Sequence, residues 1–260
     1  MPSDTAFGNF DNTGEVALIV GGGPGISASC ARLFSAAGMR VAIAARNPDK
    51  PVLKALETDH GVRSYACDAA EPAAVAELFS NVQQQLGTPK LVVHNIDGRT
   101  AAVFRQPIAE VDPEHVLATL SNSAYSAFLV GQQAARSMLE QSPDSNGLRG
   151  TILFTNASAA LKGYPKSGAF AMACHAKAGL AQSMARELMP SGIHVAQIPI
   201  DAAIGWTQPD GTRAHRLAGT SVDDNMADPD HIATVYQQLH NQHRSTWAHE
   251  IVLRPWVENW

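Results

Sequence analysis

The stretch that most constrains the fold of this 260-residue chain is EVALIVGGGPGIS, residues 15–27, in which an apolar segment ends in glycines. A short apolar run bounded by glycine is typical of a buried parallel strand. Residues 27–38 follow with apolar side chains at helical spacing and end at a glycine. A strand, a glycine turn and a helix in direct succession predict the first βα unit of a parallel sheet.

The same alternation continues along the rest of the chain. Further strands are expected at 40–46, 63–68, 90–96, 150–158, 193–200 and 249–255, with helices at 51–61, 72–87, 112–141, 169–192 and 231–240. This order predicts a single doubly wound α/β domain of Rossmann type over residues 1–260, with a mainly parallel seven-stranded sheet. Residues 205–229 are polar and loop-rich, and residues 245–260 are expected to form the last strand and a tail.

Composition excludes several classes of function. The net charge is −5, charged residues make up 17% of the chain, and there is no basic block, so neither nucleic acid nor an anionic membrane is an expected partner. No apolar run is long enough to span a bilayer, and no signal peptide is evident at the start. Three widely spaced cysteines do not form a disulfide framework, which favours a reducing compartment, and we expect a cytoplasmic protein.

The glycine turn predicts a phosphate site. Gly21, Pro24, Gly25 and Ile26 lie where the chain passes from the first strand into the first helix. Glycines allow a close backbone approach, and a helix amino terminus offers free N–H groups to an anion. The position of this turn in an alternating chain favours a dinucleotide over an ordinary glycine-rich turn.

The second predicted strand ends at Ala45 and Arg46, where a carboxylate would bind the ribose 2′-hydroxyl of NAD. An arginine at this place suits a 2′-phosphate instead, and no carboxylate is present to repel it. We therefore expect the cofactor NADP(H), although a solvated arginine at a strand end is the simpler alternative.

These motifs together resemble the short-chain dehydrogenase/reductase family over nearly the whole chain. VGGGPGIS is similar to its T-G-x-x-x-G-x-G turn, with Val20 in place of Thr and Ser27 in place of the last Gly. YACDAAE resembles the segment whose Asp68, beside Ala69, would contact adenine. VVHNIDG resembles N-N-A-G at Asn95, and GIHVAQIPI resembles the strand whose end, at Ile200, would pass the nicotinamide.

The resemblance implies a catalytic relay of Asn, Ser, Tyr and Lys, and only the lysine, Lys177, carries over without a shift. The tyrosine position, four residues earlier, is Ala173. The serine position falls on Ala157 with Ser158 beside it, and the asparagine position falls beside Asn122. The family role of the lysine implies that Lys177 holds the nicotinamide ribose as well as acting in the relay.

Another group would have to supply the proton. Our preferred candidate is Tyr164, on the loop that leads into the helix of Lys177. Cys174 shares a helical face with Lys177, but a buried structural cysteine is the more common outcome in such apolar surroundings.

His240 and His243 are expected to form a surface pair and not a metal site, because no ligand cluster accompanies them.

Three functions follow as hypotheses. The first is an NADP(H)-dependent oxidoreductase acting on a carbonyl or alcohol of a small molecule, with an atypical proton relay. The second is a dinucleotide-binding protein that regulates or binds partners without redox chemistry, and the third is a lyase or isomerase that uses the same pocket. By resemblance, residues 205–229 form a flexible lid over the substrate, and the chain forms a homodimer or homotetramer.

Overall fold

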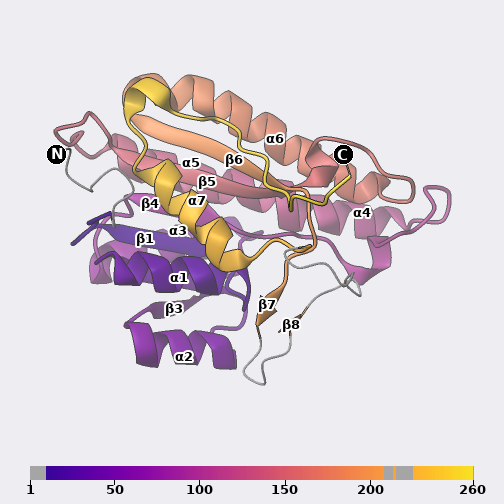
Figure 1. Ribbon diagram of the computed structural model, residues 1–260, viewed down its shortest axis with the longest axis horizontal. Helices are drawn as coiled ribbons and strands as arrows, with labels where there is room; N and C mark the ends of the chain where they lie inside the picture. The colour runs from indigo at the N-terminus through magenta and orange to yellow at the C-terminus, as the bar shows by residue number, and fades with distance from the viewer. Residues whose placement is uncertain (1–9, 208–212, 215–224, 260) are drawn as a thin grey trace.

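The computed structural model describes residues 10–207, 213–214 and 225–259, and its centre is a parallel six-stranded sheet (Figure 1). The strand order is β3-β2-β1-β4-β5-β6. The strands are β1 (Val16–Val20), β2 (Arg40–Ala45), β3 (Arg63–Ala66), β4 (Leu91–His94), β5 (Gly150–Ala157) and β6 (Ile193–Ile200). A separate antiparallel pair is formed by β7 (Trp206–Thr207) and β8 (Arg213–Ala214).

Helices cover both faces of the sheet. One face carries α1 (Ile26–Ala36), α2 (Pro51–His60) and α7 (Pro229–His240), and the other carries α3 (Pro72–Gln85), α5 (Ser126–Leu139) and α6 (Gly168–Leu188). In Figure 1, α7 lies beside α1 although the two come from opposite ends of the chain. Alternate residues of β1 point into the two cores, so every side chain of this strand is buried.

The predicted seventh strand is present only as two isolated parallel bridges, which pair Gln197 with Glu250 and Ile200 with Leu253. Backbone bonds between β6 and residues 249–253 continue on both sides of Pro199. Proline has no N–H, so the bond that residue 199 would donate across this ladder cannot form. The segment follows the edge of β6, but the sheet itself has six strands.

The predicted long helix over 112–141 is broken in its middle. α4 (Pro113–Leu120) passes into a π-helical turn, Ser121–Tyr125, before α5 begins. The hydroxyl of Ser126 donates to the carbonyl of Asn122 at 2.6 Å, and this side-chain bond lies at the end of the widened turn. Such π turns are frequent at functional sites, and this one lies beside the cleft described below.

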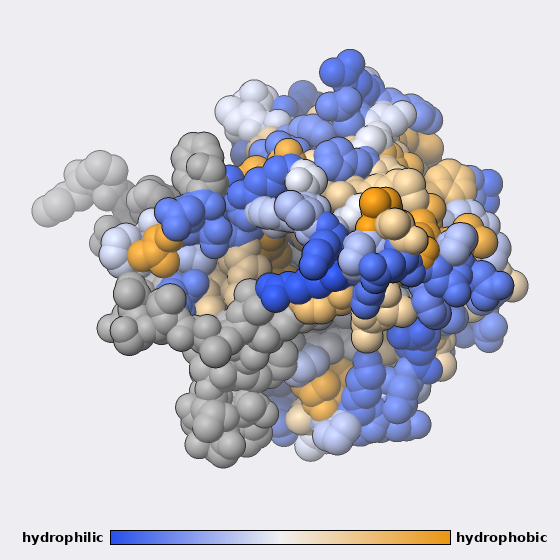
Figure 2. Space-filling model, turned by 90° about the vertical axis from the view of Figure 1, so that its right-hand side faces the viewer, coloured by the Kyte–Doolittle hydropathy of each residue, from blue (hydrophilic) through white to orange (hydrophobic). Residues whose placement is uncertain are grey.

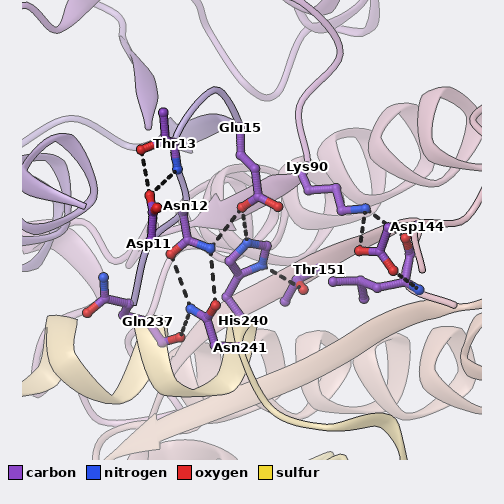
Figure 3. Close-up of polar contacts among 11 residues, drawn as sticks. Asp11, Asn12, Thr13, Glu15, Lys90, Asp144, Thr151, Gln237, His240 and Asn241 are labelled. Carbon is purple, nitrogen blue, oxygen red and sulfur yellow. Dashed lines mark hydrogen bonds and ion pairs between the residues drawn. The ribbon is translucent and has the colours of Figure 1, made fainter. Parts of the chain in front are cut away.

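A polar network lies at the amino-terminal ends of the strands (Figure 3). His240 bonds to Glu15 through Nε2 and to the Thr151 hydroxyl through Nδ1, both at 2.9 Å, and it is only 3% exposed. Burial opposes ionisation of Glu15, but hydrogen bonds from His240 and Asn12 outweigh it and lower the pKa of that carboxyl. The expectation of a surface histidine pair is therefore wrong for His240, because α7 turns this side chain into the protein.

The tail packs partly on its own chain. The indole of Trp247 stacks on the ring of His194 with centroids 4.9 Å apart, and its N–H donates to the carbonyl of Gln242. Trp256 is 77% exposed, and Trp260 lies outside the described residues. Within the described ranges, no helix has the length and hydrophobicity needed to cross a bilayer.

Replacing His240 by Ala should lower the free energy of unfolding by about 2–3 kcal/mol, because it leaves a cavity and removes one hydrogen bond each from Thr151 and Glu15. The exposed His243 is a matched control, and His243→Ala should cost less than about 1 kcal/mol. Urea denaturation of the two variants measures both effects. Equal losses would contradict a buried structural role for His240.

Candidate dinucleotide and substrate site

Two adjoining cavities lie at the carboxyl ends of the strands, where β1 and β4 diverge in the strand order. Each has a volume of about 310 Å³. The first cavity lies at the ends of β1 and β2, and the second lies between the glycine turn and the ends of β5 and β6. Figure 2 views this end of the molecule and shows apolar surface recessed behind hydrophilic side chains. The residues shared by both cavities, here called the junction, are Asn95, Ile96, Asp97 and Arg99.

The glycine turn is held against the end of β4. Gly21 has φ of +111°, and a Cβ there would lie 2.3 Å from the carbonyl oxygen of Asn95. The Ser27 hydroxyl donates to the Gly21 carbonyl at 2.8 Å and accepts from the Asn95 amide at 2.6 Å. Ser27, which replaces a family glycine, thus locks the turn, and only glycine fits at position 21.

The first helix presents its amino terminus to the second cavity. Gly25 caps α1 without a side-chain hydrogen bond, and the first turn holds no acidic residue. Pro24, Gly25 and Ile26 line this cavity, and a Cβ on Gly23 would meet nothing within 4 Å. Free N–H groups, the positive end of the helix dipole and an open glycine backbone suit a phosphate group.

Basic side chains line the far end of the first cavity. Arg46 is exposed at the end of β2, and Lys50 donates to the carbonyl of Gly22 at 2.8 Å. Asp68 and Ala69, which follow β3, line the same cavity. Lys50 was not predicted as a site residue, although the sequence shows a second basic residue four positions after Arg46.

Lys177 is the buried cation of the second cavity. It is 2% exposed, and its ammonium donates to the carbonyls of Ile96 at 2.8 Å and Thr155 at 3.3 Å. Desolvation disfavours the charged form and lowers the pKa of Lys177 to about 8, although the charge of Asp97 opposes the shift. A group with this pKa can exchange a proton near neutral pH.

The helical face around Lys177 is apolar. Ala173, at the position four residues before the lysine, is fully buried, and Phe170 and Cys174 line the cavity. Burial raises the pKa of the Cys174 thiol to about 12, so this group stays a neutral thiol. Cys174 is buried, as expected from the sequence, although it also lines the second cavity.

The other predicted catalytic residues do not gather around Lys177. Asn122 lines the first cavity, on the π-helical turn. Ser158 begins a short 3₁₀ helix (Ser158–Ala160), and Tyr164 is 43% exposed; neither lines either cavity. Tyr164 lies instead under Lys162, whose Nζ is 5.4 Å from the ring centroid.

Asp201 holds the rim of the second cavity together. This carboxylate is buried at the end of β6 and pairs with Lys162 at 3.1 Å and with Arg254 at 3.7 Å. Its neighbour Ile200 lines the cavity, so the pairing fixes the wall that Ile200 belongs to. The predicted lid over 205–229 lies partly outside the described residues, and its closure stays a prediction.

Sequence reasoning also missed the charged pair at the junction. Asp97 and Arg99 are paired at 3.2 Å, and Arg99 is stacked on Phe170. A charged residue two positions after Asn95 was visible in the sequence, but nothing local placed it between two cavities. In the described part of the chain, no group of three or more His, Cys, Asp or Glu side chains is arranged to hold a metal ion.

A larger hollow of about 870 Å³ lies at another place, bordered by Arg149, Met189–Gly192 and 243–247. Arg149 there already donates to the backbone carbonyls of Ser191, Leu139 and Gln141. This larger hollow is not lined by the glycine turn, by the amino terminus of α1 or by Lys177. The smaller pair of cavities is therefore the better candidate site, because chemistry and not size distinguishes it.

Comparison with known proteins agrees with this assignment. A family model described as enoyl-(acyl carrier protein) reductase matches residues 21–249. The 2,5-dichloro-2,5-cyclohexadiene-1,4-diol dehydrogenase of Sphingobium indicum is 26% identical, over 71% of each chain. The L-2,3-butanediol dehydrogenase of Corynebacterium glutamicum is 25% identical, over 82% of this chain and 81% of that enzyme.

The solved structures agree as well. A short-chain dehydrogenase from Rhodopseudomonas palustris is 29% identical and superposes with a TM-score of 0.73, covering 94% of this chain and 99% of the other. The matched family model spans the glycine turn, the second cavity and Lys177. The chain belongs to the short-chain dehydrogenase/reductase family.

Proposed function

We propose that the protein is an NADP(H)-dependent oxidoreductase that interconverts a carbonyl and an alcohol on a small molecule. The observation that carries this proposal is the pair of adjoining cavities, with the glycine turn at their side and Lys177 buried in the second. Similar proteins are named as dehydrogenases and reductases of diols and of a 3-oxoacyl group, which supports the reaction class.

The preference for NADP(H) rests on the first cavity. Arg46 and Lys50 both line it, and the carboxylate that would accept a ribose 2′-hydroxyl is replaced by Ala45. The two cations in the first cavity and the α1 amino terminus in the adjoining cavity form a donor set for a ligand with phosphates at both its adenosine end and its centre. The residues present therefore fit the phosphorylated dinucleotide.

Proton transfer is proposed to run through Lys177. The bound nicotinamide would supply or accept the hydride. Lys177, held by the carbonyls of Ile96 and Thr155, would exchange a proton with the substrate oxygen through water. This arrangement is atypical for the family, because Ala173 occupies the expected tyrosine position and no described tyrosine lines either cavity.

A dinucleotide-binding protein without redox activity is the second candidate, and Ala173 is the observation that favours it. A lyase or isomerase in the same pocket is a third. Titrating the purified protein with NADPH and NADH, followed by carbonyl and alcohol substrate screens, separates the three. Binding without turnover would favour the second candidate, and turnover without a change in nucleotide absorbance would favour the third.

We also propose self-association through the outer face of the α4–α5 and α6 helices. Leu117, Tyr125 and Phe128 are 68%, 44% and 41% exposed, and Met172 on α6 is 47% exposed. Large exposed apolar side chains on adjacent helices are typical of a subunit interface. The homodimer or homotetramer expected from the family would cover this face.

Lys177→Met should abolish turnover yet leave the protein equally or more stable at pH 7. The pKa of Lys177 is about 8 in the folded state and 10.5 unfolded, a difference worth about 3 kcal/mol that disfavours folding below pH 8. Because the unfolded chain binds more protons between pH 8 and 10.5, wild-type stability should rise over that window, and the variant should lack this rise. Denaturation at several pH values measures it, and parallel pH profiles would contradict the desolvated lysine.

Arg46→Ala should weaken NADPH binding by about tenfold or more and leave NADH binding within about twofold, because only NADPH carries the 2′-phosphate. Calorimetric titration of both nucleotides checks this. Asn47→Ala, which changes the uncharged neighbour of Arg46, is the control and should change neither affinity. Equal losses for the two nucleotides would remove Arg46 from 2′-phosphate recognition.

Tyr164→Phe should retain turnover within about twofold, because the phenol lies outside both cavities. Steady-state kinetics with the best substrate of the screen measures this. A loss of about 100-fold, the scale of a missing general acid, would instead place Tyr164 in the proton relay.

A further inference from the structure

Arg99 occupies the narrow point of the candidate site. It belongs to the junction shared by the two cavities, and its side chain is 21% exposed. Any ligand that fills both cavities has to pass the junction. Arg99 would therefore contact the middle of such a ligand and not either end.

Aromatic rings hold the guanidinium in place. Its Cζ lies 4.4 Å from the ring centroid of Phe170 and 5.1 Å from that of Phe104. Stacking of this kind orients the planar fork before any ligand arrives, which reduces the entropy lost when the fork binds. One branch, Nη2, donates to the carboxylate of Asp97 at 3.2 Å.

The guanidinium keeps donor capacity for a further partner. An arginine has five N–H donors, and the buried Nε of Arg99 has no hydrogen-bond partner among the described residues. A buried donor without a partner costs free energy unless a ligand supplies an acceptor. The anion-binding amino terminus of α1 lines the same second cavity.

Asp97 makes a cation necessary at this point. Its carboxylate also belongs to the junction, where it would repel an anionic ligand. Arg99 offsets that charge and adds donors of its own. A ligand that carries negative charge in its middle, where it passes the junction, suits this arrangement best.

We infer that Arg99 binds the central diphosphate of the dinucleotide in the second cavity, which the α1 amino terminus also lines, as a cofactor contact additional to the glycine turn. This inference rests on the proposed NADP(H) function. It separates two basic sites along the ligand: Arg46 and Lys50 serve the adenosine end, and Arg99 serves the middle.

The test compares ligands with and without a diphosphate. Calorimetry is carried out on the full chain with NADPH, 2′-phospho-ADP-ribose and adenosine 2′-monophosphate. For Arg99→Met we expect about tenfold to hundredfold weaker binding of the first two ligands, the range of a lost charge-assisted hydrogen bond, and unchanged binding of the third. Arg99→Lys, which keeps the charge but not the fork, should fall between.

Arg105→Met is the matched control. Arg105 also stacks on Phe104, at 5.3 Å, but lines neither cavity, so its replacement should leave all three affinities unchanged. Thermal unfolding of both variants checks that the fold is retained. Wild-type affinity of Arg99→Met and Arg99→Lys for NADPH would overturn the inference alone, as would an equal loss for all three ligands. Failure of the wild-type protein to bind any of the three ligands would overturn the proposed function with it.

Discussion

The contact between Gly21 and Asn95 is the constraint on which the site depends. β1 and β4 are neighbours in the sheet, and the chain leaves them in opposite directions, so their carboxyl ends open a crevice. At its base the Gly21 backbone approaches Asn95 too closely for any Cβ, and the Ser27 hydroxyl joins both residues. The turn, the start of α1 and the end of β4 therefore move as one unit, which fixes both cavities relative to each other.

Electrostatics within this crevice act against stability. Among the described residues, no carboxylate is bonded to the buried ammonium of Lys177, and desolvation lowers its pKa. A methionine would fill this space at lower electrostatic cost, so packing does not account for the lysine. The same reasoning applies to Asp97 and Arg99, whose charges lie where an apolar lining would be simpler.

Stability and function are separated along the sheet. The His240 network ties the start of β1 to β5 and α7 at the amino-terminal edge, away from both cavities. Asp201 stabilises the opposite end of the sheet, at the rim of the second cavity, where its ion pairs join the end of β6 to Lys162 and Arg254. These contacts hold the two ends of the strands, and the candidate site lies at the carboxyl end.

Local pattern determined the fold class, the order of the elements and the glycine turn, because hydrophobic period and glycine placement act over a few residues. It also identified Arg46, which follows the second strand, whereas Lys177 and Asn95 became candidates through the family resemblance. The tertiary structure alone decided which of the remaining polar residues meet. Tyr164 and Ser158 lie close to Lys177 in the sequence but outside its cavity, whereas Arg99 and Phe170 come together from distant segments. Pro199 and His240 show the same limit, because a missing ladder bond and a buried imidazole depend on which segment packs alongside, and sequence spacing does not encode that.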